Sequence, residues 1–203
     1  MYKRQGPSEI RRYLIENDWL DAIVQLPGNA FYNTPIATYI WIVMKNKPVT
    51  HQGKVQLLYA SACCSARRKN IGSKNVDITK VDRDLIIEAY GAYVDGIYNG
   101  VDENDKAIIV KSKVIDAIDF GYNKIVVETP KLDEDGNIVM KKMKPVADKS
   151  KRDTENVPLT EDIDVYFERE VIPYNSQAWI DKSKTKVGYE IPFTRTFYEY
   201  KQI

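Results

Sequence analysis

The sequence is poor in the residues that build disulfide frameworks, zinc sites and membrane spans. Its only two cysteines, Cys63 and Cys64, are adjacent, so they cannot link distant parts of the chain. His51 is the single histidine, and one imidazole beside two neighbouring thiols does not complete a zinc ligand set. No run of 18 apolar residues is present, which excludes a transmembrane helix from the sequence pattern. We therefore expect a cytoplasmic protein without a metal site or membrane contact.

An excess of charge of either sign is also absent. The 203 residues contain 30 Lys and Arg against 29 Asp and Glu, a net charge of +1. This balance excludes a strongly basic nucleic-acid-binding domain, so any contact with DNA must come from a local patch. The densest basic cluster consists of Arg67, Arg68, Lys69 and Lys74. Such side chains bind phosphates through charge and reach, but a solubilising surface loop or contact with an acidic partner subunit would need the same residues.

The pattern of apolar residues predicts a soluble α/β protein. Ala37–Met44 is β-branched and aromatic with almost no polar break, which is typical of a strand covered on both faces. The composition changes near residue 60, where we place a boundary between a 6–60 part and a 61–203 part. Two strands, at Leu20–Leu26 and Val55–Ala60, flank this pattern, and the Pro-, Gly- and Asn-rich Pro27–Pro35 is a loop.

The remainder of the chain predicts helices and a hairpin. Thr79 is placed to cap a helix over Lys80–Asp95, with Asp82 completing a capping box. The Asp-Gly step in Asp133–Asn137 predicts a hairpin that joins Ile125–Glu128 to Ile138–Lys142. The remaining expectations are a helix capped by Ser8 over Glu9–Asn17, a charged mobile stretch at Lys144–Asn156, a helix from Thr160 to about Val171, and no fold role for Met1–Gln5.

No complete active site can be read from the residues alone. Neither common glycine-rich phosphate loop occurs, and no cluster of metal-ligating residues is visible. A catalytic triad would have to use His51, which lies in a polar turn. The chemistry must therefore be sought through likeness to known proteins.

Long stretches of the chain match the sequence of one known family. The likeness begins with IRRYLIENDWLDAIVQLPGNAFYNTPIATYIWIVMKNK at Ile10–Lys47. It continues in family order through DFGYNKIVVETP (Asp119–Pro130), RDTENVPL (Arg152–Leu159), YFEREVIP (Tyr166–Pro173) and VGYEIPFTRTFYEY (Val187–Tyr200). Through these stretches the chain closely resembles the modification (M) subunit of type I restriction-modification systems. These subunits are DNA adenine-N6 methyltransferases that use S-adenosylmethionine.

The resemblance implies a place in the methyltransferase fold. Leu20–Leu26 and Ala37–Met44 resemble the last two strands of its Rossmann-like sheet, the final one antiparallel, and an α+β extension would follow from residue 61. The family's cofactor-binding glycine motif and its Asn-Pro-Pro-aromatic motif do not occur in these 203 residues. The chain therefore looks like the C-terminal part of a longer enzyme. We expect this part alone to be inactive and to hold no cofactor.

The resemblance also assigns site residues and partners. Phe31 matches the aromatic residue that stacks on the extruded adenine, with Tyr32 as the substitute and Asn33 as a polar neighbour; the alternative is that Phe31 or Tyr32 plugs the end of the sheet. The implied partners are double-stranded DNA, the specificity (S) and restriction (R) subunits and a second M subunit. A non-enzymatic DNA- or protein-binding module derived from the same fold remains the rival interpretation.

Overall fold

The computed structural model describes residues 6–102 and 104–198, which form two compact units. Unit 1 contains residues 1–12 and 118–190, and unit 2 contains residues 13–117 and 191–203. The chain passes between the units within α1 (Gly6–Glu16), after Ala117 and after Glu190. Met1–Gln5 lies outside the described residues, so the expectation for it has no counterpart here.

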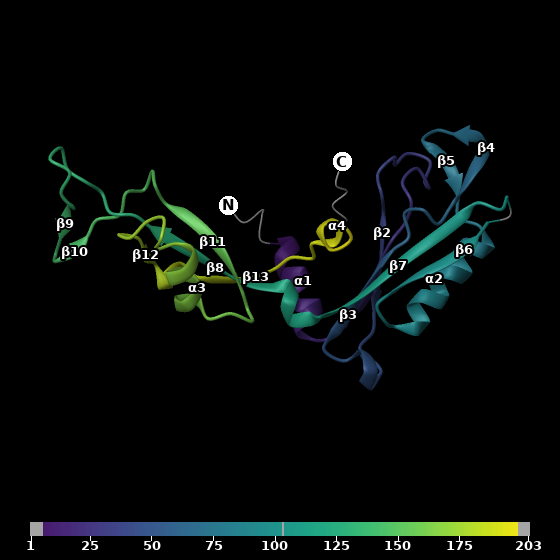
Figure 1. Cartoon of the computed structure of the whole chain (residues 1–203), viewed down its shortest axis with the longest axis horizontal. Helices are drawn as coiled ribbons and strands as arrows, with labels where there is room; N and C mark the ends of the chain where they lie inside the picture. Colours follow the sequence, from purple (N-terminus) through teal and green to yellow (C-terminus); the bar gives the residue numbers. More distant parts are fainter. Residues whose placement is uncertain (1–5, 103, 199–203) are drawn as a thin grey trace. The chain divides into compact units, whose positions relative to one another are not determined.

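Unit 2 is built on a five-stranded mixed sheet with the strand order β2-β1-β3-β7-β6 (Figure 1). β1 pairs in parallel with β3, whereas the other neighbours pair antiparallel. Because β1 and β3 run in the same direction, their carboxyl ends lie at one edge of the sheet, where the Ala60 amide donates to the Gln25 carbonyl (3.1 Å). The strands are β1 (Leu20–Gln25), β2 (Tyr39–Val43), β3 (Lys54–Tyr59), β6 (Gly96–Val101) and β7 (Ala107–Asp116). The predicted α/β class is confirmed.

Helix α2 (Lys80–Ala92) packs against strands β3, β6 and β7 of this sheet. Thr79 is its N-cap, and the reciprocal hydrogen bonds between Thr79 and Asp82 form the predicted capping box. The helix ends at Tyr93, which has a left-handed φ of 49° and therefore stops the helix before the predicted end at Asp95. The core beneath α2 contains Val24, Leu26, Leu58, Ala60, Cys63, Leu85, Ala89, Ile108 and Val110.

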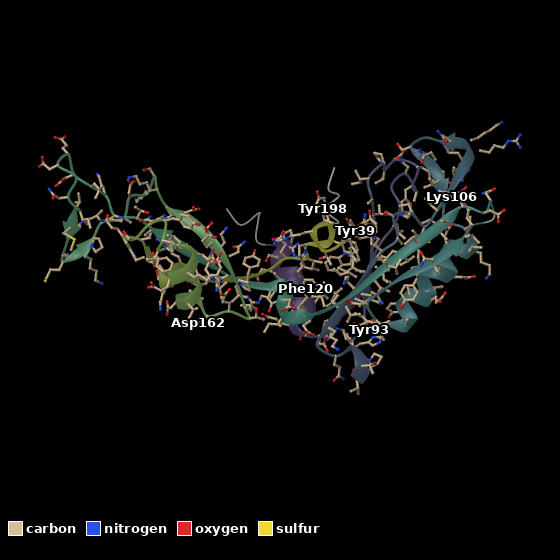
Figure 2. All side chains as sticks on the ribbon, viewed as in Figure 1. Tyr39, Tyr93, Lys106, Phe120, Asp162 and Tyr198 are labelled. Atoms are coloured by element: carbon tan, nitrogen blue, oxygen red, sulfur yellow. The ribbon has the colours of Figure 1, made fainter. Side chains whose placement is uncertain are left out.

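The prediction that Ala37–Met44 is covered on both faces is wrong. The strand forms as β2, but Tyr39, Ile40 and Trp41 are 40–48% exposed. β2 lies at the edge of the sheet and has a single neighbour, β1, so an apolar sequence alone does not secure its burial. Helix α4 (Phe193–Thr196) covers part of β2. The Phe193 ring meets the ring of Tyr39, labelled in Figure 2, edge-on, with the ring centroids 5.3 Å apart.

Unit 1 is centred on β8 (Gly121–Glu128), which carries buried Ile125 and Val127. Helix α3 (Ile163–Glu170) supplies Phe167 to the same core and is capped by Asp162, which is labelled in Figure 2. The strands that pair with β8 are β11 (Asp153–Pro158), β12 (Trp179–Ile180) and β13 (Lys186–Tyr189). Unit 1 is therefore a second α+β body with its own core.

Three local predictions need correction. Ser8 lies inside α1 and does not cap it; its hydroxyl instead accepts from the Tyr189 amide (3.1 Å). The Asp133–Asn137 turn forms. The strand β8 nevertheless pairs with β11, farther along the chain, and not with the segment that follows the turn. The stretch 144–156, predicted to be mobile, contains β10 (Lys144–Pro145), paired with β9 (Met140–Lys141), and the start of β11.

The predicted boundary at residue 60 separates the end of the methyltransferase domain from the extension that follows it, and it stays a prediction. The compact units divide the chain elsewhere, and β3 on one side of residue 60 pairs with β7 on the other. Among the described helices, none combines the length and the apolar character needed to cross a membrane.

Candidate nucleic-acid interface

The loop that carries Phe31 begins where β1 ends, at the edge of the sheet that β1 and β3 share. Hydrogen bonds close it at its base, from the Leu26 amide to the Thr38 carbonyl (2.8 Å) and from the Asn29 amide to the Pro35 carbonyl (3.2 Å). Phe31 and Thr34 then form an isolated antiparallel bridge. This bridge leaves Tyr32 and Asn33 at the tip of a tight, ordered turn.

The three predicted site residues of this loop all reach the surface. Phe31 is 45% exposed and Tyr32 is 56% exposed, and Asn33 is also exposed. Neither ring is buried in the core of unit 2. The rings are thus accessible to a ligand, and their role in stacking on a base stays a prediction.

A β-hairpin rises from the same edge, shortly after β3 ends. It consists of β4 (Ser65–Ile71) and β5 (Lys74–Asp77), joined by a Gly72-Ser73 turn (Figure 1). At its base the buried Ser65 hydroxyl donates to Asp102 Oδ2 (2.9 Å). Backbone amides of Lys106 and Asn104 donate to the same carboxylate and hold the pKa of Asp102 below its ordinary value. The hairpin is therefore anchored to a carboxylate that stays ionised.

The basic cluster does not act as one group of four charges. Arg67 donates to both carboxylate oxygens of Asp77 (2.5 and 2.6 Å), and Lys74 Nζ lies 3.0 Å from Asp77 Oδ1. These two cations lower the pKa of Asp77, with the hydrogen bond from Lys74 as the larger cause. Arg68 and Lys69 are exposed, and no ion pair of either is found within the described part of the chain. Arg68 and Lys69 are thus the two exposed cations of the cluster, and their contact with phosphate stays a prediction.

The structure joins the two predicted sites. The Ser73 amide donates to the Tyr32 carbonyl (2.8 Å), and the Asn75 amide donates to the Asn29 carbonyl (3.1 Å). The Lys74 ammonium also lies over the Tyr32 ring, 5.5 Å from its centroid. The aromatic loop and the basic hairpin therefore form one surface, which we call the loop–hairpin surface.

Two residues of this surface were missed by the sequence analysis. Asp77 organises the cations, and Gly72 makes the closest approach to the aromatic loop. The signal for Gly72 was present, since Gly-Ser between two short runs is typical of a hairpin turn. Asp77 could not be found in this way, because its pairing with Arg67 depends on the register of that hairpin.

A buried polar cluster lies toward the opposite end of β1. Asp21 is fully buried, accepts from the Tyr90 hydroxyl (2.6 Å) and pairs with His51 Nδ1 (2.9 Å). The His51 ring stacks on Tyr93, with centroids 3.4 Å apart. Burial, followed by the contact with Asp21, raises the pKa of Tyr90 to about 12. We interpret this cluster as a structural tie between the end of α2 and β1.

Comparison with known proteins gives the family of this chain. The family model for N-6 DNA Methylase matches residues 1–134, well over half of the sequence. The chain belongs to the N-6 DNA methylase family. This finding, with the relatives described next, confirms the resemblance to modification subunits of type I restriction systems.

Two similar proteins are methylase subunits of type I restriction enzymes. The chain is 40% identical over 47 residues to the type I restriction enzyme MpnII methylase subunit of Mycoplasma pneumoniae, a match that covers 23% of this chain and 9% of that protein. It is 32% identical over 82 residues to the MjaVII methylase subunit of Methanocaldococcus jannaschii, covering 38% of this chain and 14% of that protein. The chain thus spans only a small part of the length of these relatives.

A solved structure is also similar. It is the methyltransferase subunit of a type I restriction-modification system from Streptococcus thermophilus, with 23% identity and a TM-score of 0.40. The match covers 53% of this chain and 19% of that one.

The two glycines at this edge, Gly28 and Gly72, do not form an open cradle for S-adenosylmethionine, the methyl donor that the resemblance implies. Glycines that admit a cofactor leave room for it against the backbone. Here a Cβ at Gly28 would lie 3.0 Å from the Pro35 carbonyl oxygen, and one at Gly72 would lie 2.6 Å from the Tyr32 carbonyl oxygen. The space beside both glycines is taken by the protein's own backbone, so we derive no step through the cofactor.

Proposed function

We propose that this chain supplies the target-base loop and part of the DNA-contacting surface of a type I DNA adenine-N6 methyltransferase. The methyl donor and the catalytic Asn-Pro-Pro motif would belong to parts of the enzyme other than these residues. On this proposal β1 and β2 correspond to the last two strands of the methyltransferase sheet. The enzyme would act on double-stranded DNA in the cytoplasm, together with specificity and restriction subunits and a second modification subunit.

One observation carries the proposal, namely an exposed aromatic turn built onto a basic hairpin at the carboxyl edge of the sheet. Ligands of open α/β sheets bind outside the carboxyl ends of the strands. An enzyme that methylates a base must extrude it from the duplex, and stacking on an aromatic face repays part of that cost. Phe31 and Tyr32 offer such faces, while Arg68 and Lys69 offer charge for the flanking phosphates.

The chemistry assigned to this chain is positioning. Phe31 would hold the extruded adenine by stacking, and Asn33 would offer a polar group beside it. Neither residue needs to exchange a proton with the substrate, because holding the reacting atoms in place supplies much of the rate. No group of this chain is required to act as acid or base.

Replacing Phe31 by Ala in the complete methylase tests the proposal. Base–aromatic stacking is worth about 1–3 kcal/mol, so the single-turnover methylation rate should fall by roughly one to two orders of magnitude. The affinity for S-adenosylmethionine should not change, because on this proposal Phe31 contacts the base and not the cofactor. Rate and affinity are measured by methyl transfer to a duplex with one target site and by calorimetry.

Ile36→Ala is the matched control, since Ile36 is an exposed apolar residue of the same loop away from its tip. That variant should methylate at the wild-type rate. If Phe31→Ala does so too, the loop does not stack on the base, and a binding module without a catalytic role becomes the better account.

A further inference from the structure

The β4–β5 hairpin contacts the aromatic loop through backbone hydrogen bonds. Two backbone hydrogen bonds join them, in which the main-chain amides of Ser73 in the turn and Asn75 in β5 donate to loop carbonyls. A backbone hydrogen bond fixes the position of a chain more closely than a contact between two mobile side chains does. The tip of the loop thus takes its position from the hairpin.

Gly72 makes this approach possible. Its φ of +58° lies in the left-handed region, and a Cβ there would lie 2.6 Å from the Tyr32 carbonyl oxygen. Any side chain at this position would strain the turn and push the two segments apart. The close fit therefore depends on a residue with no side chain.

Lys74 adds a side-chain contact to the same place. Its side chain is only 20% exposed, and the ammonium lies 3.0 Å from Asp77 Oδ1 and over the Tyr32 ring, 5.5 Å from its centroid. A cation over an aromatic face is attracted to it, and more strongly where water is partly excluded. Because Asp77 fixes the ammonium, Lys74 restrains the plane of the Tyr32 ring.

We propose that Lys74 is a positioning residue for base capture, holding Tyr32 and, through the Phe31–Thr34 bridge, Phe31 in the orientation that receives the extruded adenine. This inference rests on the proposed function of the loop. It separates Lys74 from Lys69 of the same hairpin, which is exposed and suited to a phosphate. Lys74 would act on the methylation step, and Lys69 on the affinity for DNA.

The test compares Lys74→Met, which keeps an unbranched side chain but removes the charge, with Lys74→Arg, which keeps the charge. Lys69→Met is the matched control on the same hairpin. All are made in the complete methylase with its specificity subunit. Three quantities are measured: hydrogen exchange of the amides of residues 29–34 without DNA, the dissociation constant for target DNA, and the single-turnover rate at saturating DNA.

For Lys74→Met we expect faster hydrogen exchange in residues 29–34, a methylation rate at least five-fold lower and a DNA dissociation constant within two-fold of wild type. Lys74→Arg should restore the rate and the slow exchange. Lys69→Met should weaken DNA binding and leave the hydrogen exchange of the loop amides at the wild-type rate. Tyr32→Leu should lower the methylation rate at least as much as Lys74→Met, and the double variant should be no worse than Tyr32→Leu alone, because Lys74 acts through the Tyr32 ring.

The inference is overturned if Lys74→Met leaves loop exchange unchanged, or if it weakens DNA binding alone as Lys69→Met does. It is also overturned if exchange rises but the saturated rate stays at the wild-type value. Phe31→Ala, run in parallel, separates these results from failure of the proposed function. A slow Phe31→Ala beside a normal Lys74→Met rejects only the role of Lys74, whereas a normal Phe31→Ala rejects the base-stacking loop itself.

Discussion

Cys63 and Cys64 form a small buried pair, and Cys63 has no exposed surface. The Cys63 thiol donates to the Asp82 carbonyl (3.3 Å) at the start of α2. Burial, reinforced by the charge of Asp82, raises the pKa of Cys63 to about 12. The pKa of Cys64 is raised as well, again mainly by burial.

We therefore expect both thiols to resist alkylation in the folded protein. At pH 8, a pKa of about 12 leaves roughly one Cys63 thiol in ten thousand as the reactive thiolate. Iodoacetamide should label neither cysteine in native protein, and both in 6 M guanidinium chloride, as read by intact-mass spectrometry. Rapid labelling of the native protein would show that this corner of the core opens readily.

Single residues also show what the sequence could reveal about the candidate site. Phe31 was found by resemblance and its loop by local chemistry, since Pro, Gly and Asn end a strand wherever they cluster. Lys74 was predicted as a phosphate ligand, but in the structure it pairs with Asp77 and contacts Tyr32. Residue type alone could not separate Lys74 from Lys69, because the difference lies in the register of a hairpin.

At the scale of elements, α2 and α3 begin differently. Thr79 closes the capping box of α2 with Asp82, whereas Thr160 lies two residues before Asp162, the N-cap of α3. The sequence assigned both threonines to helix starts. The capping box at Thr79 is local and could be predicted directly. For α3, the sequence spacing did not show that Asp162, and not Thr160, is the N-cap.

Thr79→Ala should lower the free energy of unfolding of unit 2 by about 1 kcal/mol, the usual cost of removing an N-cap side chain. Thr160→Ala is the control and should change stability by no more than about 0.5 kcal/mol, the ordinary range for an exposed position. Urea denaturation followed by circular dichroism measures both. Equal losses in the two variants would contradict the assignment of the caps.

The hairpin predicted between 125–128 and 138–142 illustrates the limit of local signals for strands. The turn residues did reverse the chain, as the Leu132–Ile138 bridge shows. They did not determine the partner of β8, which pairs with β11 some thirty residues later. Turn chemistry fixes a reversal, whereas strand partners follow from burial of faces such as that of Ile125 and Val157.

At the scale of the whole molecule, each unit has its own core and its own buried charges. In unit 1, Glu128 is 2% exposed and pairs with Arg152 Nη2 (2.7 Å) and Lys184 Nζ (2.9 Å). Hydrogen bonds from these cations, led by Arg152, hold the pKa of Glu128 below its ordinary value. The stabilisation is therefore present above the unfolded pKa and is lost as the pH falls through the folded one.

Unit 1 should accordingly lose stability as the pH drops from about 5 toward 3. Glu128→Gln should weaken unit 1 at pH 7 and flatten that dependence, whereas Glu134→Gln, at an exposed site in the same unit, should do neither. Trp179 reports on unit 1, so its fluorescence in a Trp19→Phe, Trp41→Phe background follows urea denaturation of this unit alone. An unaltered pH dependence in Glu128→Gln would contradict the role of this ion pair.

The parallel course of β1 and β3 has a consequence for anyone who wishes to transplant the aromatic loop. Excising residues 27–35 into another scaffold would leave the Asn29 and Tyr32 carbonyls without the donors that now satisfy them. The unit that would have to be transplanted consists of two segments, the aromatic loop and the β4–β5 hairpin, which lie about forty residues apart in the chain. An insertion in one segment would have to be matched by a change in the other.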